Sequence, residues 1–173
     1  MPTSTVLVSQ ADIQHRIVTL AAEIERDYPA GNGIHLVAIL KGGFMFMADL
    51  VRAMSERVTM DFMAVSSYGK GTTSSGQVRV LKDLDSNVEG RHVILVEDIV
   101  DTGLTLHYLQ DLLKARAPAS LRTACLLSKP SRRKVDVKVD YIGFTIDDHF
   151  VVGYGLDYAE KYRNLPYIAV LQQ

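Results

Sequence analysis

Hydrophobic residues near the start of the chain recur with the period of a helix. Residues 13–24 carry apolar side chains at every third or fourth position, and this spacing predicts an amphipathic helix with one buried face. Ser9 and Asp12 stand just before it with the spacing of a capping box, Asp replacing the usual Glu. Turn-forming residues at 28–33 end the helix. The apolar positions are Ile13, Ile17, Leu20 and Ile24.

A continuous apolar run, Ile34–Leu40, follows the turn. Because both of its faces are apolar, it is typical of a central parallel strand. Residues 58–62 alternate between apolar and polar and predict another strand, and residues 77–81 predict its hairpin partner beyond a Ser-, Thr- and Gly-rich loop at 66–76. Further strands are predicted at 92–96, 121–127, 139–144, 151–155 and 166–171, and further helices at 44–54 and from about 105 to 116.

The order of these elements indicates the fold class. Strands that alternate with helices favour an α/β protein with an open, mainly parallel twisted sheet flanked by helices and joined by right-handed crossovers. In such sheets ligands bind at the carboxyl ends of the strands. At about 150 residues per domain, a chain of 173 residues predicts a single domain over residues 1–173.

Charge and composition narrow the possible functions. The chain has 19 Lys and Arg against 20 Asp and Glu. A near-neutral chain has no strong field for steering onto nucleic acid, so no nucleic-acid partner is expected. The sequence has no apolar run near the roughly 18 residues of a membrane span and no signal-peptide pattern, so we expect a cytoplasmic protein without membrane contact. Its single cysteine, Cys125, lies in an apolar run and is expected to be a buried thiol.

The segment from 93 to 105 contains the most informative chemistry. A predicted buried strand leads into three carboxylates, Glu97, Asp98 and Asp101, and like charges this close need a cation or hydrogen-bond donors. Small and hydroxyl residues at 102–105 then open a helix whose N-terminal amides form a phosphate site. Acids beside a phosphate cradle point to a sugar phosphate and a bridging Mg²⁺. The simpler alternative is an acidic turn with an ordinary threonine cap.

Other familiar motifs are missing from the sequence. It has neither the P-loop pattern nor the glycine-rich dinucleotide fingerprint after its first central strand. The G-x-G at 153–155 stands alone and is a weak signal. The histidines show no metal-ligand spacing and are expected to be surface or core residues; they are His15, His35, His92, His107 and His149.

Residues 93–103 resemble the phosphoribosyl pyrophosphate (PRPP) motif of the type I phosphoribosyltransferases. Residues 40–43, 67–68, 129–130 and 150–158 resemble segments of the hypoxanthine-guanine phosphoribosyltransferases in the same order. The resemblance covers nearly the whole chain, and the stretch at 150–158 is its part specific for 6-oxopurines. It implies the type I phosphoribosyltransferase fold, with a small hood and a mobile lid loop at about 66–87.

The resemblance implies a purine salvage enzyme that transfers the 5-phosphoribosyl group of PRPP to hypoxanthine or guanine. The products would be IMP or GMP and pyrophosphate, with Mg²⁺ as cofactor. Asp101 matches a general base that takes the proton from purine N7. The positions that match the 5′-phosphate and ribose site are Glu97, Asp98, Asp101, Thr102, Gly103, Leu104 through its backbone, and Thr105.

The resemblance assigns the remaining site residues in the same way. Lys41, Gly42 and Arg163 match pyrophosphate-binding positions, in a loop where a peptide bond is often cis. The base site would comprise Lys129 as donor to O6, Phe150 stacking on the ring, Val151 reading the purine edge through its backbone, and Asp157. The metal ligands would be Glu97, Asp98 and Asp157, and the lid would begin at Ser67 and Tyr68.

Several of these residues have simpler explanations when each is taken alone. Asp101 could cap a helix, Lys129 could be a solvated surface charge and Phe150 could be a core residue. The main alternatives for the whole chain are a nucleotide-sensing regulator on the same fold and a transferase that prefers xanthine. A pyrimidine transferase and a phospho-acceptor signalling domain fit the motifs less well. The family also suggests a homodimer or homotetramer, with small molecules as the other partners.

Overall fold

The computed structural model describes residues 4–55, 57–67 and 78–172. Its centre is a six-stranded sheet with the strand order β4-β3-β2-β5-β6-β7. Neighbouring strands are parallel except β3 and β4, which form an antiparallel hairpin. The mainly parallel sheet predicted from the sequence is therefore confirmed. The strands are β2 (Ile34–Leu40), β3 (Val58–Ser67), β4 (Val78–Lys82), β5 (His92–Val100), β6 (Ser120–Ser128) and β7 (Tyr141–Thr145).

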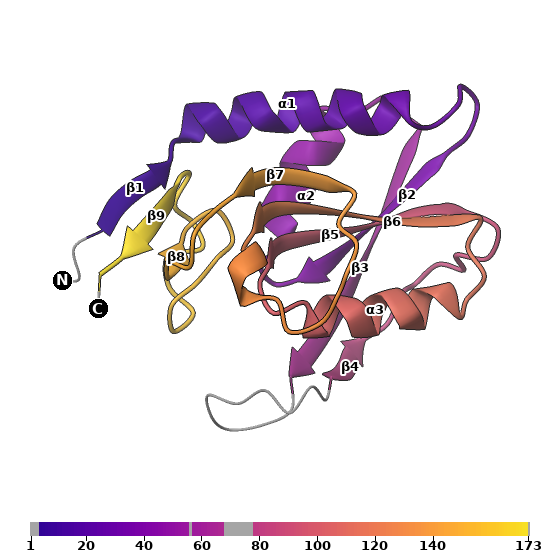
Figure 1. Ribbon diagram of the computed structural model, residues 1–173. Helices are drawn as coiled ribbons and strands as arrows, with labels where there is room; N and C mark the ends of the chain where they lie inside the picture. The colour runs from indigo at the N-terminus through magenta and orange to yellow at the C-terminus, as the bar shows by residue number, and fades with distance from the viewer. Residues whose placement is uncertain (1–3, 56, 68–77, 173) are drawn as a thin grey trace.

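Helices cover both faces of this sheet (Figure 1). Helices α1 (Gln10–Arg26) and α2 (Phe44–Arg52) pack on one face, and α3 (Leu104–Lys114) packs on the other. Strand β2 divides its side chains between them, because successive residues of a strand point to opposite faces. Leu36 and Ala38 join the core under α1 and α2, whereas Val37 and Ile39 join the core under α3. This division explains why both faces of the strand are apolar, with His35 as its one polar residue.

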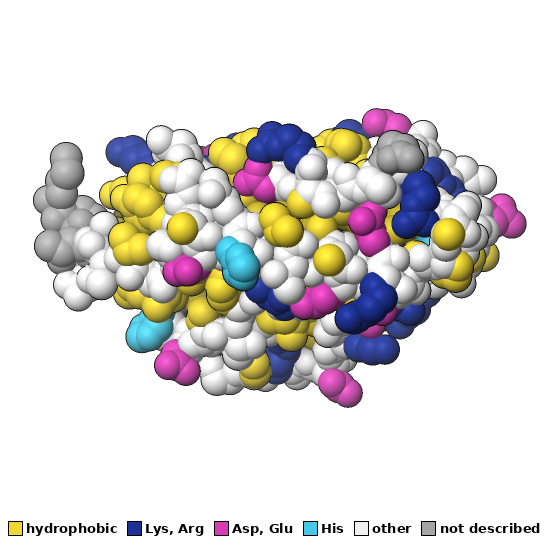
Figure 2. All heavy atoms as spheres, turned by 90° about the horizontal axis from the view of Figure 1, so that it is seen from above, with side chains coloured by type: hydrophobic (Ala, Val, Ile, Leu, Met, Phe, Trp, Pro, Cys, Tyr) yellow, Lys and Arg dark blue, Asp and Glu magenta, His cyan; other side chains and the backbone are white. Residues whose placement is uncertain are grey.

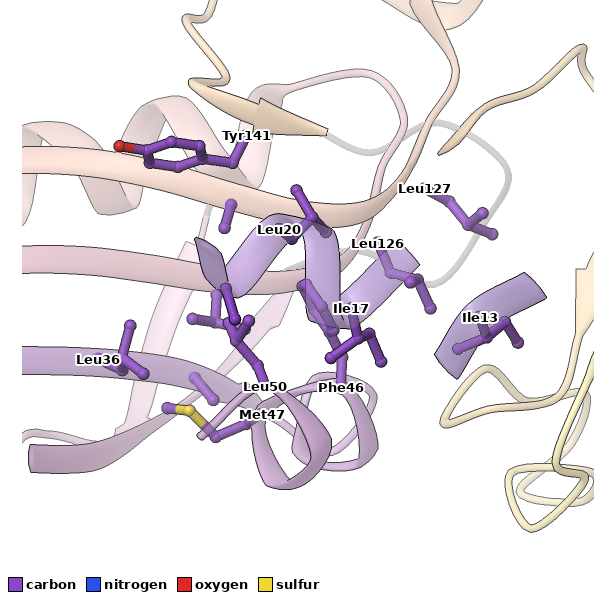
Figure 3. Close-up of a cluster of buried hydrophobic side chains, with 14 of the residues drawn as sticks. Ile13, Ile17, Leu20, Leu36, Phe46, Met47, Leu50, Leu126, Leu127 and Tyr141 are labelled. Carbon is purple, nitrogen blue, oxygen red and sulfur yellow. The ribbon is translucent and has the colours of Figure 1, made fainter. Parts of the chain in front are cut away.

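The core under α1 confirms the helical spacing of its apolar residues. Ile17 lies beside Phe46 and Leu50 of α2 in the close-up of Figure 3, and Ile13 and Leu20 belong to the same buried cluster. All five side chains are almost completely buried, and burial of such a side chain is worth about 1.5–3 kcal/mol. At the start of α1, the Ser9 hydroxyl oxygen accepts the amide of Asp12 at 3.1 Å, so the predicted cap is present.

A second, antiparallel sheet of three strands forms a hood at the carboxyl ends of the parallel strands (Figure 1). It contains β1 (Ser4–Val8), β9 (Ile168–Leu171) and β8 (Val151–Val152), in that order. The sequence does not predict β1, since four of its five residues are exposed and no burial pattern marks it. It becomes a strand by pairing with β9 at the far end of the chain, Ser4 opposite Leu171.

The structure moves two predicted strand boundaries near the site. Strand β5 continues to Val100 rather than ending at residue 96, so Glu97 and Asp98 lie within it. Strand β3 continues to Ser67 and pairs there with Val78 of β4, so the loop expected from residue 66 starts later. Residues 68–77 lie outside the described part of the chain. The basic loop after β6 contains a short 3₁₀ helix, η1 (Pro130–Arg132).

The surface carries charges of both signs. On the face seen in Figure 2, Lys and Arg side chains are interspersed with Asp and Glu. This pattern agrees with the near-neutral total charge of the chain. Within the three described ranges, the helices are too short or too polar to cross a membrane.

Candidate active site

Two acidic side chains occupy the carboxyl end of the central strand β5. Glu97 is 8% exposed, and Asp98 follows it in the strand. Burial, together with the neighbouring charge of Asp98, raises the pKa of Glu97 well above its usual range. Burial also raises the pKa of Asp98, although the amide of Ile99 and the charge of Arg163 oppose the rise. Two destabilised carboxylates side by side favour a bound cation.

A pocket lies where β5 passes into α3. Its cavity volume is about 100 Å³, and it opens to solvent. Gly103 is the N-cap of α3 with φ 83°, a conformation that favours glycine, and the Thr102 hydroxyl accepts the amide of Leu104 at a long 3.4 Å. The first amides of a helix lack helical acceptors and carry the positive end of its dipole, so they are suited to an anion. The pocket is lined by Glu97, Ile99, Val100, Asp101, Thr102, Gly103, Thr105 and Leu106.

The loop between β2 and α2 lies directly against Asp98. A Cβ placed on Gly42 would lie 1.9 Å from Oδ2 of Asp98, so any other residue at this position would have to displace that carboxylate. A Cβ on Gly155 would in turn lie 2.1 Å from the Gly42 carbonyl oxygen. The resemblance implies that the peptide between Lys41 and Gly42 is often cis, whereas the structure has its cis peptide one residue earlier, between Leu40 and Lys41. The loop is therefore held between β5 and the segment at 153–163.

That segment supplies two of the predicted charged residues. Asp157 and Arg163 form an ion pair at 3.3 Å, and Arg163 Nη1 donates to the Gly155 carbonyl at 2.8 Å. Glu160 joins the cluster, since its carboxylate pairs with Lys41 Nζ at 2.8 Å. The backbone is tightly folded here, with positive φ at four non-glycine positions. They are Tyr154, Ala159, Glu160 and Tyr162, with φ between 51° and 78°.

A chain of alternating charges begins at Asp101, which lines this pocket. Asp101 Oδ1 lies 3.1 Å from Arg132 Nε, and Arg132 Nη1 lies 3.7 Å from Asp148 Oδ2. The second oxygen of Asp148 lies 3.5 Å from Lys129 Nζ. Lys129 is only 6% exposed, which excludes the solvated surface charge considered from the sequence. The structure thus places Asp101 and Lys129 at two ends of one ionic network.

The remaining predicted residues lie at the hood and at the sheet edge. Val151 is buried in β8, whereas Phe150 is 42% exposed and therefore not a core residue. The ring of Phe150 meets that of Tyr158 edge-on, with 5.7 Å between centroids. Ser67 is the last residue of β3, away from these contacts, and Tyr68 lies outside the described residues.

The sequence matches the family model of the phosphoribosyl transferase domain over residues 8–159. That match spans most of the chain. The chain belongs to the phosphoribosyltransferase family. The resemblance seen in its motifs is thereby confirmed, and so is the fold class.

Individual relatives of this phosphoribosyltransferase are similar over nearly its whole length. It is 51% identical to the hypoxanthine-guanine phosphoribosyltransferase of Bacillus subtilis over 167 aligned residues. The alignment covers 96% of this chain and 92% of the relative. It is 50% identical to the enzyme of that name from Streptococcus thermophilus, covering 97% of this chain and 93% of the relative. A crystal structure of a hypoxanthine-guanine phosphoribosyltransferase from Bacillus anthracis superposes with a TM-score of 0.94 at 49% identity, covering 99% and 100% of the two chains.

Four charged residues of the phosphoribosyltransferase site were not predicted from the sequence. The sequence did contain a clue to three of them, because the basic stretch at 129–134 and the acids at 147–148 lie next to predicted site residues in the chain. Their pairing depends on how β6 and the segment after β7 meet in space. The missed residues are Arg132, Arg133, Asp148 and Glu160.

The acidic pair fits the Mg²⁺ that the family resemblance implies. The carboxylates of Glu97 and Asp98 are oxygen donors, and nothing in the described residues donates a hydrogen bond to the Glu97 side chain. Within the described ranges, no three acidic, His or Cys side chains converge on a common metal position. Mg²⁺ bound by one or two carboxylates completes its coordination with water and substrate oxygens, which agrees with such a partial set.

Proposed function

We propose that this phosphoribosyltransferase transfers the 5-phosphoribosyl group of PRPP to hypoxanthine or guanine and releases pyrophosphate. One observation carries the proposal. The network from Asp101 through Arg132 and Asp148 to Lys129 lies beside a pocket suited to a phosphate. A carboxylate and a buried ammonium next to a sugar-phosphate site suit a purine with an N7 proton and a 6-oxo group. The close relatives named hypoxanthine-guanine phosphoribosyltransferase support the same activity.

In this proposal the base is recognised along one edge. Lys129 donates a hydrogen bond to O6, and Asp101 accepts the proton of N7 as N9 attacks the ribose. An ammonium group has no acceptor, so it disfavours the 6-amino group of adenine. Phe150 stacks on the exposed face of the purine, and the Val151 backbone reads the opposite edge. The 42% exposure of Phe150 leaves a ring face free for this contact.

PRPP would occupy the space between the acidic pair and the phosphate pocket. The amides and hydroxyls at 102–105 hold its 5′-phosphate. Glu97 and Asp98, with Asp157 at a second position, would hold Mg²⁺, which when bound would supply positive charge to offset that of the pyrophosphate and would coordinate the ribose hydroxyl oxygens. Lys41 and Arg163 bind the pyrophosphate, and their present partner Glu160 keeps both side chains on this side of the site. Most of the rate enhancement then comes from positioning and electrostatics.

Further expectations belong to the same proposal. Ser67 and Tyr68 would begin a lid that excludes water during turnover. The chain would act as a single domain in a homodimer or homotetramer, in the cytoplasm, on small molecules. Thermal unfolding in one transition and a sedimentation mass of two or four chains would support these points.

Release of pyrophosphate is the assay that tests the activity. PRPP and Mg²⁺ are supplied with hypoxanthine, guanine, xanthine or adenine in parallel. We expect turnover with hypoxanthine or guanine, loss of turnover with EDTA, and little reaction with adenine. Turnover with xanthine alone would move the specificity but keep the mechanism. Nucleotide binding without turnover of any base would favour the regulator instead.

The role of Asp101 has its own test. Asp101→Asn keeps the size of the side chain but removes the proton acceptor. We expect kcat to fall by about 10²–10⁴-fold, the usual contribution of a general base, with a much smaller change in PRPP affinity. Asp111→Asn, on the exposed face of α3, is the matched control. An unchanged kcat in Asp101→Asn would reduce Asp101 to a structural residue of the loop.

A further inference from the structure

A single arginine side chain binds the backbones of both loops that the proposed function places around the purine. Arg133 Nη1 donates to the carbonyl of Val100 at 2.8 Å and to that of Asp101 at 2.7 Å. The same nitrogen lies 3.3 Å from the carbonyl of Lys129, and Nη2 donates to Ser128 Oγ at 2.8 Å. The guanidinium thus joins the end of β5 to the end of β6.

The surrounding backbone strengthens this junction. The amide of Lys129 donates to the Val100 carbonyl at 3.0 Å, and the amide of Lys134 donates to the Thr102 carbonyl at 2.9 Å. The stem of Arg133 passes beneath the phosphate loop, since its Cδ lies 3.5 Å from the place of a Cβ on Gly103. The residue is half-buried and belongs to none of the groups that the proposed function places on substrate.

The need for such a junction follows from where the sheet ends. Strands β5 and β6 stay in register up to the pair Val100 and Ser128. The next residues are Asp101 and Lys129, so the sheet no longer sets the distance between them. Purine N7 and O6 sit on one rigid edge, and both side chains must meet that edge together. A misplacement of about 1 Å can cost about 100-fold in rate.

We propose that Arg133 is a positioning residue that holds Asp101 and Lys129 at the spacing of purine N7 and O6. This inference rests on the proposed function. Arginine suits the task because its rigid planar fork presents several donors in fixed directions. A lysine offers one nitrogen on a flexible stem and cannot reach the backbone carbonyls and Ser128 Oγ at once. Arg133→Lys keeps the charge and therefore removes mainly the geometry.

The test compares Arg133→Lys in two backgrounds. In the wild-type background we expect kcat/KM for hypoxanthine to fall by about 100-fold. In an Asp101→Asn background the same substitution should cost clearly less, because the part of its effect that passes through Asp101 is already lost. Equal losses in both backgrounds, or an unchanged kcat/KM in the first, would overturn the proposal. Arg133→Gln is measured beside it, and failure of both variants to fold would make Arg133 a folding residue and overturn it too.

A matched control distinguishes a loss of positioning in the site from a general loss of protein stability. Arg16 also donates to two backbone carbonyls, those of Gly143 at 3.0 Å and Ile142 at 2.7 Å, but it belongs to α1. Arg16→Lys should lower the melting temperature while kcat/KM stays within about threefold of wild type, as expected for a contact outside the site.

Hydrogen exchange supplies a readout that needs no turnover. The amides of Lys129 and Lys134 are hydrogen-bonded across the junction, so Arg133→Lys should speed their exchange at least tenfold relative to Arg16→Lys. Unchanged exchange at both amides would overturn the proposal. If the wild-type protein turned over no purine, the proposed function would fail, whereas the exchange result would still report whether Arg133 holds the two loops.

Discussion

Replacement of Gly42 by alanine should disable the site through a single methyl group. An ideal Cβ at Gly42 would lie 1.9 Å from Oδ2 and 2.7 Å from Cγ of Asp98. Cβ contacts below 3.0 Å are essentially never seen, so the Asp98 carboxylate or the loop must move by about 1.1 Å. The loop has little room to retreat, because the Gly42 carbonyl already touches Gly155. The carboxylate is therefore the group that moves.

The size of the effect follows from this displacement. A shift of about 1 Å in a positioned group can cost about 100-fold in rate, so kcat/KM for PRPP should fall by about that factor. Forcing an extra methyl group into a packed site costs about 1–3 kcal/mol of unfolding free energy. Both effects should appear in Gly42→Ala, the first through Asp98 and the second through the crowded backbone.

The assay measures pyrophosphate release at varied PRPP, with urea unfolding to obtain the free energy of unfolding. Gly33→Ala is the matched control, because the nearest atom to its Cβ would be the Arg57 carbonyl oxygen at an ordinary 3.6 Å. That variant should keep its activity and change stability by less than about 1 kcal/mol. A Gly42→Ala protein that folds and retains wild-type kcat/KM for PRPP would refute the close approach of the loop to Asp98.

Three further predictions concern stability and reactivity. Burial and the charge of Arg91 lower the pKa of His35, so below about pH 6.5 the unfolded chain binds a proton that the folded chain does not, and the free energy of unfolding should decrease as the pH falls. His35→Gln should reduce the difference between the free energies of unfolding measured with urea at about pH 5.5 and at about pH 7.5. The same change at the exposed His15 should leave that difference as it is in the wild type. Burial raises the pKa of Cys125 to about 12, so Ellman's reagent should label it only in denaturant, and fast labelling of the native protein would contradict its burial. Asp61 accepts the amides of Asp85 and Ser86, each at 2.9 Å, so Asp61→Asn should lose about 1–3 kcal/mol in thermal unfolding, and an unchanged stability would show that these contacts contribute little.

Much of the fold could be predicted because its signals are local. The apolar spacing of α1 and the continuous apolar run of β2 each follow from a nearby face that must be buried. Strand β1 could not be found in this way, since its pairing with β9 joins opposite ends of the chain. The extension of β5 through Glu97 and Asp98 also escaped prediction, because charged residues in a central strand contradict its usual composition.

The candidate site also has a part that local sequence signals predict and a part that depends on contacts between distant segments. Sequence alone identified the family and predicted the acidic end of β5 and a phosphate loop at 102–105, since each signal lies in a contiguous stretch with its own chemistry. Only the tertiary structure decided that Lys129 is buried against Asp148, and that Arg133 holds the loops after β5 and β6 together. These contacts join segments that meet only when parallel strands align their carboxyl ends. A residue pattern records what each segment can do, whereas packing determines which segments lie close enough to act on one substrate.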